Sequence, residues 1–221
     1  MAEAAELARV GCASGTIVGA DEQTAGIGRH GRKWHSAPGE GLYVSFVLRL
    51  TLGARHLPVL MLALGLATRD AIATTSKLTP DLRWPNDVLI GEKKCAGILA
   101  QVEGGAVIAG IGINVCQRSF PEGLNTPATS LVIEGAQVSR EELLVALAHA
   151  VDRYCTILTV TGADEIMRQF TQASTYAAGR RVRADSVEGV AIGLDASGFL
   201  MIREDSGRET TILAGGVRPV N

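Results

Sequence analysis

Hydrophobic residues recur every three or four positions in four segments of the chain, and this spacing predicts helices over 2–10, 57–76, 143–158 and 163–173. The repeat is clearest in the second segment, where Leu60, Leu64 and Ala67 mark one face. Ser139 stands three residues ahead of Glu142, a capping-box spacing that predicts a helix start just before the third segment.

Shorter runs rich in β-branched and aromatic residues predict strands over 16–20, 42–50, 88–90, 97–102 and 106–115. From Gly179 onward the pattern changes to short apolar runs separated by glycine-containing turns. We therefore expect an α/β (α+β) fold, with a mixed β-sheet of about seven strands flanked by helices over residues 1–178. A small β module is expected over residues 179–221, and its size requires it to lean on the first domain for stability.

The charge balance excludes a broad basic surface. The 221 residues carry 21 Lys+Arg against 23 Asp+Glu, a formal net charge of -2, whereas nucleic-acid binding needs a positive field. The longest apolar run, 57–67, is too short to cross a bilayer, and the acidic N-terminus lacks a basic region ahead of an apolar stretch. The 4 cysteines show neither zinc-site nor disulfide spacing. We expect a cytoplasmic protein that binds neither nucleic acid nor membrane.

A glycine-rich, basic segment lies between the first two predicted strands. Residues 26–31, GIGRHG, fit the G-x-G-x-x-G pattern, but a basic loop follows where a dinucleotide fold requires a helix, so that fold is not expected. Backbone N–H groups at the glycines, together with Arg29, Arg32 and Lys33, can converge on a phosphate. A flexible, solvated basic loop is the simpler alternative. Trp34 beside the cluster can stack on a nucleobase or anchor the loop.

Two further groups of residues could carry chemistry. Residues 83–87, RWPND, form a turn that presents Asn86 and Asp87 from a strand end, and Lys94 abuts the next apolar strand. A fixed ammonium there can neutralise a carboxylate and a phosphate together, although lysines at hairpins are more often solvated. Residues 110–114, GIGIN, form a strand whose glycines permit close approach of a ligand or of another backbone.

The order of these segments and the residues in them closely resemble those of the biotin–protein ligase family, over nearly the whole chain. The matching stretches are residues 22–26, 28–34, 83–88, 94–99, 110–115 and 128–131, followed by the C-terminal pattern. The resemblance implies a class II synthetase-like biotin/lipoate ligase catalytic domain followed by an SH3-like β-barrel.

The resemblance also implies an ATP-dependent biotin–[acetyl-CoA-carboxylase] ligase. Such an enzyme uses ATP and Mg²⁺ to form biotinyl-5′-AMP and then transfers biotin to a lysine of a biotin carboxyl carrier protein. By analogy, Lys94, Arg29 and Asp87 are the expected catalytic residues. Lys94 would contact the junction of carboxylate and phosphate, Arg29 would lie in the loop that closes over the adenylate, and Asp87 would lie near the metal or the attacking amine.

The same analogy assigns the substrate-binding residues. Biotin is expected against Gln23, Gly28, Gly97 and Gly112, whereas Trp34 would stack on adenine. The full set expected to contact biotin or nucleotide is Gln23, Gly26, Ile27, Gly28, Arg29, Arg32, Trp34, Asn86, Lys94, Gly97, Gly110, Gly112 and Asn114.

Two features depart from the family pattern. Position 27 is Ile where the family usually has Arg, so one loop cation is missing and weaker retention of the intermediate is expected. Family members also carry a Ser-Thr-Asn strand end ahead of the first helix, and this sequence begins at about that Asn. We expect either a start further upstream or a pocket without that wall. The sequence shows no helix-turn-helix module, so operator binding is not expected.

Two rival functions also fit the sequence. A lipoate–protein ligase would share the fold, although the segments GRHGRKW and RWPND favour biotin. A catalytically impaired protein that binds biotin or biotinyl-adenylate is the second rival, and the presence of Lys94 argues against it. The oligomeric state is expected to be monomer or homodimer.

Overall fold

The computed structural model describes residues 1–51 and 56–220, and its larger sheet has six strands in the order β1-β2-β6-β5-β4-β3. These strands are β1 (Ile17–Ala20), β2 (Gly41–Leu48), β3 (Asp81–Arg83), β4 (Asp87–Ile90), β5 (Lys93–Glu103) and β6 (Ala106–Asn114). All adjacent pairs are antiparallel. Of the two isolated bridges in the described part of the chain, Lys94 to Ala128 is parallel and Ile27 to Lys33 is antiparallel. The predicted class, a sheet flanked by helices, is confirmed, but the sheet is antiparallel where a mixed one was expected.

The path of the chain explains this difference. The helix after β2 carries the chain to the far edge of the sheet, and the hairpins β3-β4-β5-β6 then return it to the side of β2. This helix therefore spans the sheet and does not join neighbouring strands. The sequence pattern also missed β3, because this strand has only 3 residues and follows directly after Pro80.

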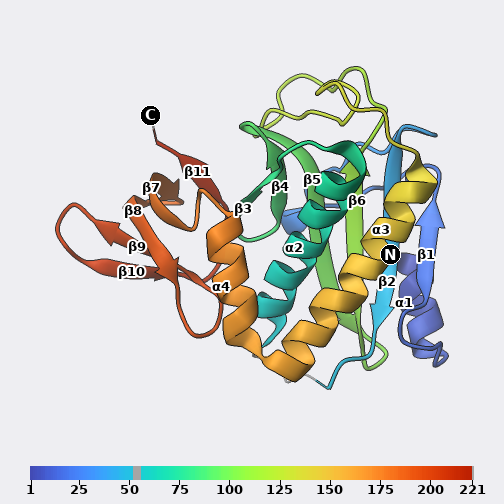
Figure 1. Ribbon diagram of the computed structural model, residues 1–221, viewed down its shortest axis with the longest axis horizontal. Coiled ribbons are helices and arrows are strands. Elements are labelled where there is room, and N and C mark those ends of the chain that lie inside the picture. Colours follow the sequence, from blue (N-terminus) through green and yellow to red (C-terminus); the bar gives the residue numbers. More distant parts are fainter. Residues whose placement is uncertain (52–55, 221) are drawn as a thin grey trace.

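Three helices form one layer over the sheet: α2 (Leu57–Ser76), α3 (Arg140–Thr156), which continues as a π-helical turn (Ile157–Thr161), and α4 (Ala163–Ala173). Figure 1 shows α2 and α3 side by side in front of the sheet. The predicted start of α3 is confirmed, since Oγ of Ser139 accepts a hydrogen bond from the backbone N–H of Glu142.

The two faces of the sheet belong to separate hydrophobic clusters. On β2, Val44 and Phe46 face the cluster beneath α2 and α3, whereas Val47 faces the other side. There it packs with Ala4 and Ala8 of the short helix α1 (Ala2–Arg9). On β6, Gly110 and Gly112 alternate in the same phase as Ile108, which belongs to the α1 cluster. The glycine face of the sheet is therefore the one that the three-helix layer leaves open.

Two helical stretches, Leu57–Ser76 and Arg140–Thr161, are long and apolar enough to cross a membrane by length and composition alone. In the folded chain α2 packs against α3 and against the sheet, and 61% of its most apolar window is buried. Burial of this kind is what a core helix shows, so α2 owes its apolar composition to its place in the core.

The C-terminal strands form a second sheet of five strands in the order β10-β9-β8-β7-β11. They are β7 (Ala178–Ala184), β8 (Val187–Leu194), β9 (Leu200–Glu204), β10 (Glu209–Ile212) and β11 (Val217–Pro219). Buried residues of this sheet, such as Val182 and Ile202, join the same hydrophobic cluster as the larger sheet. Nε1 of Trp84 also donates to the carbonyl of Gly198 at 3.0 Å. The small C-terminal sheet therefore packs against the rest of the chain, as its size predicted.

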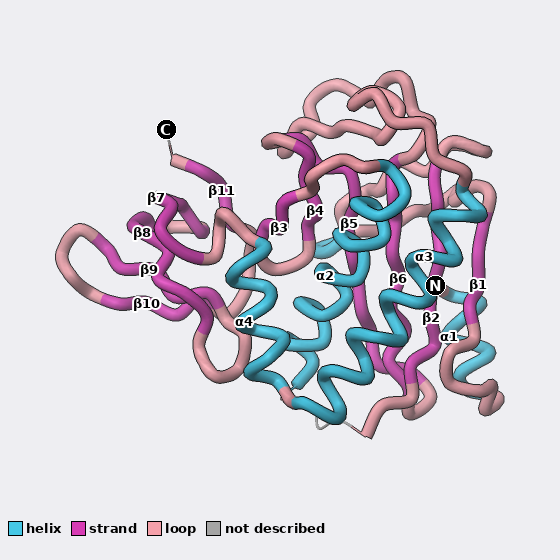
Figure 2. The backbone as a smooth tube through the Cα atoms, viewed as in Figure 1, coloured by secondary structure: helices cyan, strands magenta, loops and turns pink. Residues whose placement is uncertain are grey.

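Long loops gather at one end of the larger sheet (Figure 2). The segment between β6 and α3, coloured green to yellow in Figure 1, supplies much of this end. The candidate site lies beside these loops, where β11 also approaches the larger sheet.

Candidate active site

The glycine-rich segment folds back on itself as a narrow loop. The backbone N–H of Gly28 donates to the carbonyl of Arg32 at 2.7 Å, and that of Trp34 donates to the carbonyl of Gly26 at 2.9 Å. A Cβ on Gly26 would lie 2.5 Å from the Trp34 carbonyl, so only glycine fits there. The loop contains a short 3-10 turn (Arg29–Gly31) in which His30 has φ 58. The sequence predicted a basic loop, and the fold gives that loop a defined shape.

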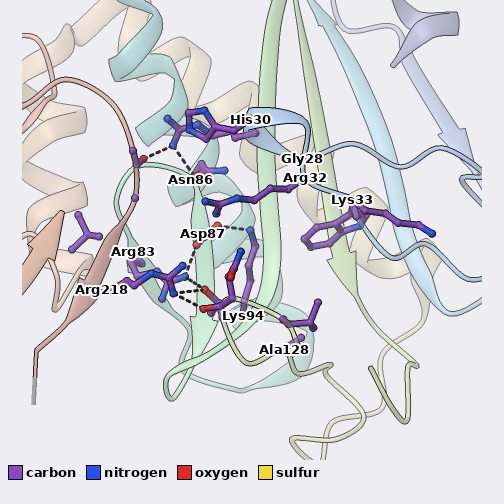
Figure 3. Close-up of a pocket in the computed structure, with 18 of the residues that line it drawn as sticks. Gly28, His30, Arg32, Lys33, Arg83, Asn86, Asp87, Lys94, Ala128 and Arg218 are labelled. Atoms are coloured by element: carbon purple, nitrogen blue, oxygen red, sulfur yellow. Dashed lines mark hydrogen bonds and ion pairs between the residues drawn. The ribbon is translucent and has the colours of Figure 1, made fainter. Parts of the chain in front are cut away.

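The RWPND turn arranges its charges around one carboxylate. Nη2 of Arg83 lies 2.6 Å from Oδ2 of Asp87, and Nζ of Lys94 forms an ion pair with Oδ1. The neighbouring Asn86 is fixed because its Nδ2 donates to the carbonyl of Ile98 at 2.9 Å. Figure 3 shows Asp87 between Arg83 and Lys94. Lys94 is thus held in place by Asp87, which Arg83 holds in turn.

Burial works to raise the pKa of Asp87, but Lys94 and Arg83 beside it together hold that pKa below the ordinary 3.8. Asp87 therefore stays ionised at neutral pH. Both of its oxygens already face cations, and no cluster of three His, Cys, Asp or Glu side chains occurs in residues 1–51 and 56–220. These residues do not fit a metal ion held by the protein alone.

Facing glycines on β5 and β6 lie beneath Trp34. Gly97 and Gly112 are register partners, and a Cβ on Gly112 would lie 2.7 Å from Nε1 of Trp34. Nζ of Lys94 lies 5.3 Å from the centroid of the indole ring, within cation–π range. Nε1 of Trp34 is buried and has no hydrogen-bond partner within the described part of the chain. Trp34, expected to stack on adenine, here covers the glycines expected to contact biotin.

Two cavities meet at this point. The larger, of about 860 Å³, lies between the larger sheet, the loop 120–128 and the β11 region. The smaller, of about 60 Å³, lies on the glycine face of the sheet. The residues that line both are Gly28, Arg29, Trp34, Asn86 and Lys94. The glycine loop and Lys94 therefore form a shared wall between a small pocket and a large one.

The larger cavity is strongly cationic. Arg29, Arg32, Arg83 and Lys94 line it from the larger domain, whereas Asp87 is the carboxylate that faces them. Nη1 of Arg29 donates to Oδ1 of Asn86 at 3.2 Å and to the carbonyl of Gly215 at 2.9 Å. Burial lowers the pKa of Arg29, with Asp87 opposing that change and Arg32 adding to it. Arg29 remains charged, because an ordinary arginine pKa is far above neutrality.

The predicted site residues are brought together. With one exception, each of them lines one or both cavities: Gln23, Ile27, Gly97, Gly110 and Gly112 line the small one, Arg32, Asp87 and Asn114 the large one, and Gly28, Arg29, Trp34, Asn86 and Lys94 both. The exception, Gly26, shapes the loop behind them. Ile27 is 62% exposed, so the position that lacks the family's arginine faces solvent at the rim.

Sequence reasoning missed several residues that line the larger cavity. Arg83 lay within a recognised segment but received no role, and nothing in the sequence linked the turn around Gly215, or Arg218, to a site far earlier in the chain. A run of small residues before the last strand, Ala214 to Gly216, was the one local signal for close approach of the backbone.

Comparison with known proteins shows which families this chain matches. The model of the Biotin/lipoate A/B protein ligase family matches residues 8–117, and that of the Biotin protein ligase C terminal domain matches residues 179–217. The biotin--[acetyl-CoA-carboxylase] ligase of Paracoccus denitrificans is 34% identical over 222 residues, which cover 94% of this chain and 92% of that protein.

Longer relatives and a solved structure also match. The bifunctional ligase/repressor BirA of Bacillus spizizenii is 33% identical over 91% of this chain, and the match spans 66% of BirA's own length. The structure of a biotin protein ligase from Aquifex aeolicus in complex with biotin and ATP superimposes with a TM-score of 0.85 at 32% identity. It covers 97% of this chain and 94% of that one.

Proposed function

The chain belongs to the biotin–protein ligase family, and on this premise we propose that it activates biotin with ATP and transfers it to a lysine of an acceptor protein. The first half-reaction joins the biotin carboxylate to the α-phosphate of ATP and releases pyrophosphate. In the second, the acceptor amine attacks the acyl carbon of biotinyl-5′-AMP and displaces AMP.

The main support for this proposal is that the two cavities share a wall. An acid and a nucleotide that react with each other need separate pockets that open onto one point, and Lys94 and Arg29 line both cavities at that point. The small pocket has a glycine floor and takes the biotin ring system. The large cationic cavity takes ATP. The carboxylate and the α-phosphate then meet beside the Lys94 ammonium.

Positioning and charge neutralisation supply the catalysis. Lys94 neutralises the carboxylate and phosphate oxygens as they approach, and a fixed charge of this kind contributes about 10²- to 10³-fold in rate. Asp87 holds the lysine in place through its Oδ1, and Arg83 anchors Asp87 from the other side. Arg29 and Arg32 bind the phosphate from the glycine loop, and Asn114 borders the nucleotide. The acceptor amine is also proposed to approach Asp87, which lines the large cavity.

The small pocket is too tight for biotin while Trp34 covers its floor. Ligand pockets usually exceed about 300 Å³, whereas this one has about 60 Å³. The indole therefore moves away from Gly97 and Gly112 when biotin enters, which frees it to stack on the adenine of ATP. Mg²⁺ arrives with ATP as part of the substrate, since it is commonly bound through substrate phosphates.

Several partners and properties belong to the same proposal. The acceptor is a biotin carboxyl carrier protein or domain, and the enzyme works in the cytoplasm as a monomer or homodimer, without nucleic acid or membrane. The catalytic domain comprises residues 1–178 and the SH3-like domain residues 179–221.

The proposal is tested by incubating the purified chain with MgATP, biotin and a biotin carboxyl carrier domain, and by measuring the acceptor's mass. We expect a single biotinyl addition that is lost when the acceptor lysine is replaced. The same assay with lipoate tests the lipoate ligase rival: an equal lipoyl addition would favour it. Biotin binding by calorimetry without any acceptor modification would favour the impaired-binder rival.

A further inference from the structure

Lys94 lies on a face of the larger sheet where regular alternation along β5 would not place it. Ala96 and Ile98 belong to the cluster beneath α2 and α3, whereas Gly97 between them faces the other side, under Trp34. Successive residues of a strand point to opposite faces, so regular alternation would put Lys94 on the helix side with Ala96. Instead its Cε lies 3.0 Å from the position of a Cβ on Gly97. An irregularity in β5 therefore turns this lysine onto the glycine face.

The irregularity is an extra residue in β5. Ala96 pairs with Val88 of β4. Lys94 pairs with Leu89, the next residue of β4. Cys95 is therefore inserted between two consecutive pairs, which makes a β-bulge, and its side chain is buried in the helix-side cluster. Bulges next to active sites commonly redirect a side chain. The direction of the Lys94 side chain thus depends on the conformation of this bulge.

The bulge is bonded to a segment outside the strands of the sheet. The backbone N–H of Lys94 donates to the carbonyl of Pro127 at 2.7 Å, and its carbonyl accepts from the N–H of Thr129 at 2.9 Å. These bonds form the isolated bridge between Lys94 and Ala128, which lie next to each other in Figure 3. Ala128 also lines the large cavity. This segment therefore fixes the backbone from which the lysine side chain extends.

One carboxylate anchors this segment. The hydroxyl of Thr129, which is fully buried, donates to Oε1 of Glu134 at 2.5 Å. The same oxygen lies 2.5 Å from Nζ of Lys93. Lys93 and Thr129 together hold the pKa of Glu134 below its ordinary 4.5, so the carboxylate is ionised at neutral pH. The pair with Lys93 is 45% exposed on the lysine side and contributes little, whereas a buried hydrogen bond to a charged acceptor is strong. The bond to Thr129 is therefore the one that holds the segment.

We propose that Glu134 is a positioning residue for Lys94. It anchors Thr129, whose backbone holds the bulge of β5 in the form that directs the lysine onto the glycine face. Asp87 holds the other end of the same side chain, so the lysine is fixed both at its backbone and at its ammonium. The inference rests on the proposed adenylation and adds to it a residue that lines neither substrate cavity.

The test compares Glu134→Ala with wild type and with Lys93→Ala, which removes the exposed ion pair but keeps the bond between Glu134 and Thr129. Single-turnover formation of biotinyl-5′-AMP is measured at saturating biotin and MgATP. Glu134→Ala is expected to lower this rate about tenfold, because a misplacement of about 1 Å can cost about 10²-fold and Asp87 still holds the ammonium. Glu134→Gln, whose amide oxygen can still accept from Thr129, recovers part of the loss, and Lys93→Ala behaves as wild type.

A second comparison separates positioning from a general structural role. Glu134→Ala is also introduced into the Lys94→Ala variant, and the adenylation rates of the two chains are compared. Residues that act through one another have non-additive effects, so the added substitution is expected to cause no further loss once the lysine is absent. A further loss as large as that in wild type would overturn the inference. So would a wild-type rate in Glu134→Ala alone, or equal losses in Glu134→Ala and Lys93→Ala.

Amide hydrogen exchange separates this inference from the proposed function, because it requires no turnover. The exchange rates of the backbone N–H groups of Lys94 and Thr129, which form the bridge, are measured by NMR in wild type and in Glu134→Ala. Faster exchange at these two positions, with unchanged exchange in α2, supports a local release of the bulge. Equal rates in the two chains contradict it. If the wild type forms no biotinyl-5′-AMP, the proposed adenylation fails, and these exchange rates alone decide whether Glu134 holds the bulge.

Discussion

At the scale of single residues, the site depends on one lysine whose position is set by an ion pair. Lys94 touches Asp87, which Arg83 holds from its other oxygen. The sequence could indicate Lys94, because it abuts an apolar strand within a family segment. It could not indicate that Asp87 is held between two cations, since Arg83 reaches it through the turn geometry.

Replacing Lys94 by Ala is expected to lower the rate of biotin adenylation about 10²- to 10³-fold, because the variant loses the charge at the reacting oxygens. Arg83 still neutralises Asp87, so the variant folds, with an unchanged far-UV circular dichroism spectrum. Lys93→Ala is the matched control, since Lys93 is 45% exposed and pairs with Glu134 outside both cavities. Adenylation at the wild-type rate by Lys94→Ala would remove the lysine from the mechanism.

A second residue prediction concerns the floor of the small pocket. Gly112→Ala places a methyl group 2.7 Å from Nε1 of Trp34, on the floor that the proposed function assigns to biotin, and overpacking of this kind costs about 1–3 kcal/mol. The KM for biotin should rise about tenfold or more, with the KM for ATP nearly unchanged. Gly19→Ala serves as control, because its Cβ would meet Val44 at a relaxed 3.8 Å. Equal effects of the two substitutions would contradict the assignment of the pocket.

The lowered pKa of Asp87 predicts a pH dependence of stability. A carboxylate whose folded-state pKa lies below its unfolded value of about 3.9 stabilises the fold above that pH, and the contribution is lost as the pH falls through the folded-state pKa. Asp87→Asn should therefore be less stable than wild type at pH 7, and the difference should shrink towards pH 3. Urea unfolding at several pH values measures it. A difference that grows in acid would show that the sign is wrong.

At the scale of elements, helices were the easiest to predict. The bounds of α2 and α4 match the predicted 57–76 and 163–173, because helical spacing extends over many residues. Strand order was not predictable, since a helix between two strands does not reveal whether it leads to the neighbouring strand or across the sheet. The strand β3 has only 3 residues, which are too few to show an alternation of apolar and polar positions.

The cap of α3 gives a prediction at this scale. Ser139→Ala removes the acceptor for the backbone N–H of Glu142 and should lower the free energy of unfolding by about 1 kcal/mol. Ser139→Asp, which retains an acceptor, should stay near the wild-type value. Denaturation in urea measures both. An Ala variant as stable as wild type would mean that the cap contributes nothing measurable.

At the scale of the whole molecule, the C-terminal sheet joins both the core and the site. Its buried residues belong to the same hydrophobic cluster as the larger sheet, and its Gly215 carbonyl accepts a hydrogen bond from Arg29 of the glycine loop. The change of sequence pattern at Gly179 indicated a separate module. It could not reveal contacts with residues far earlier in the chain, because nothing local to either segment encodes them.

A shared core predicts a single cooperative unfolding transition. Tryptophan fluorescence, which includes Trp84 at the contact with Gly198, and far-UV circular dichroism should give the same urea midpoint. Two separated midpoints would mean that the C-terminal sheet unfolds independently of the larger sheet.

Biotin-dependent exchange of labelled pyrophosphate into ATP by the purified chain, with lipoate in place of biotin as the comparison, tests the proposed adenylation most directly. The proposed function predicts exchange that requires biotin and does not occur with lipoate. Absence of exchange with saturating biotin and MgATP, in a chain shown to be folded, would contradict the proposal that Lys94 and the two cavities serve biotin adenylation.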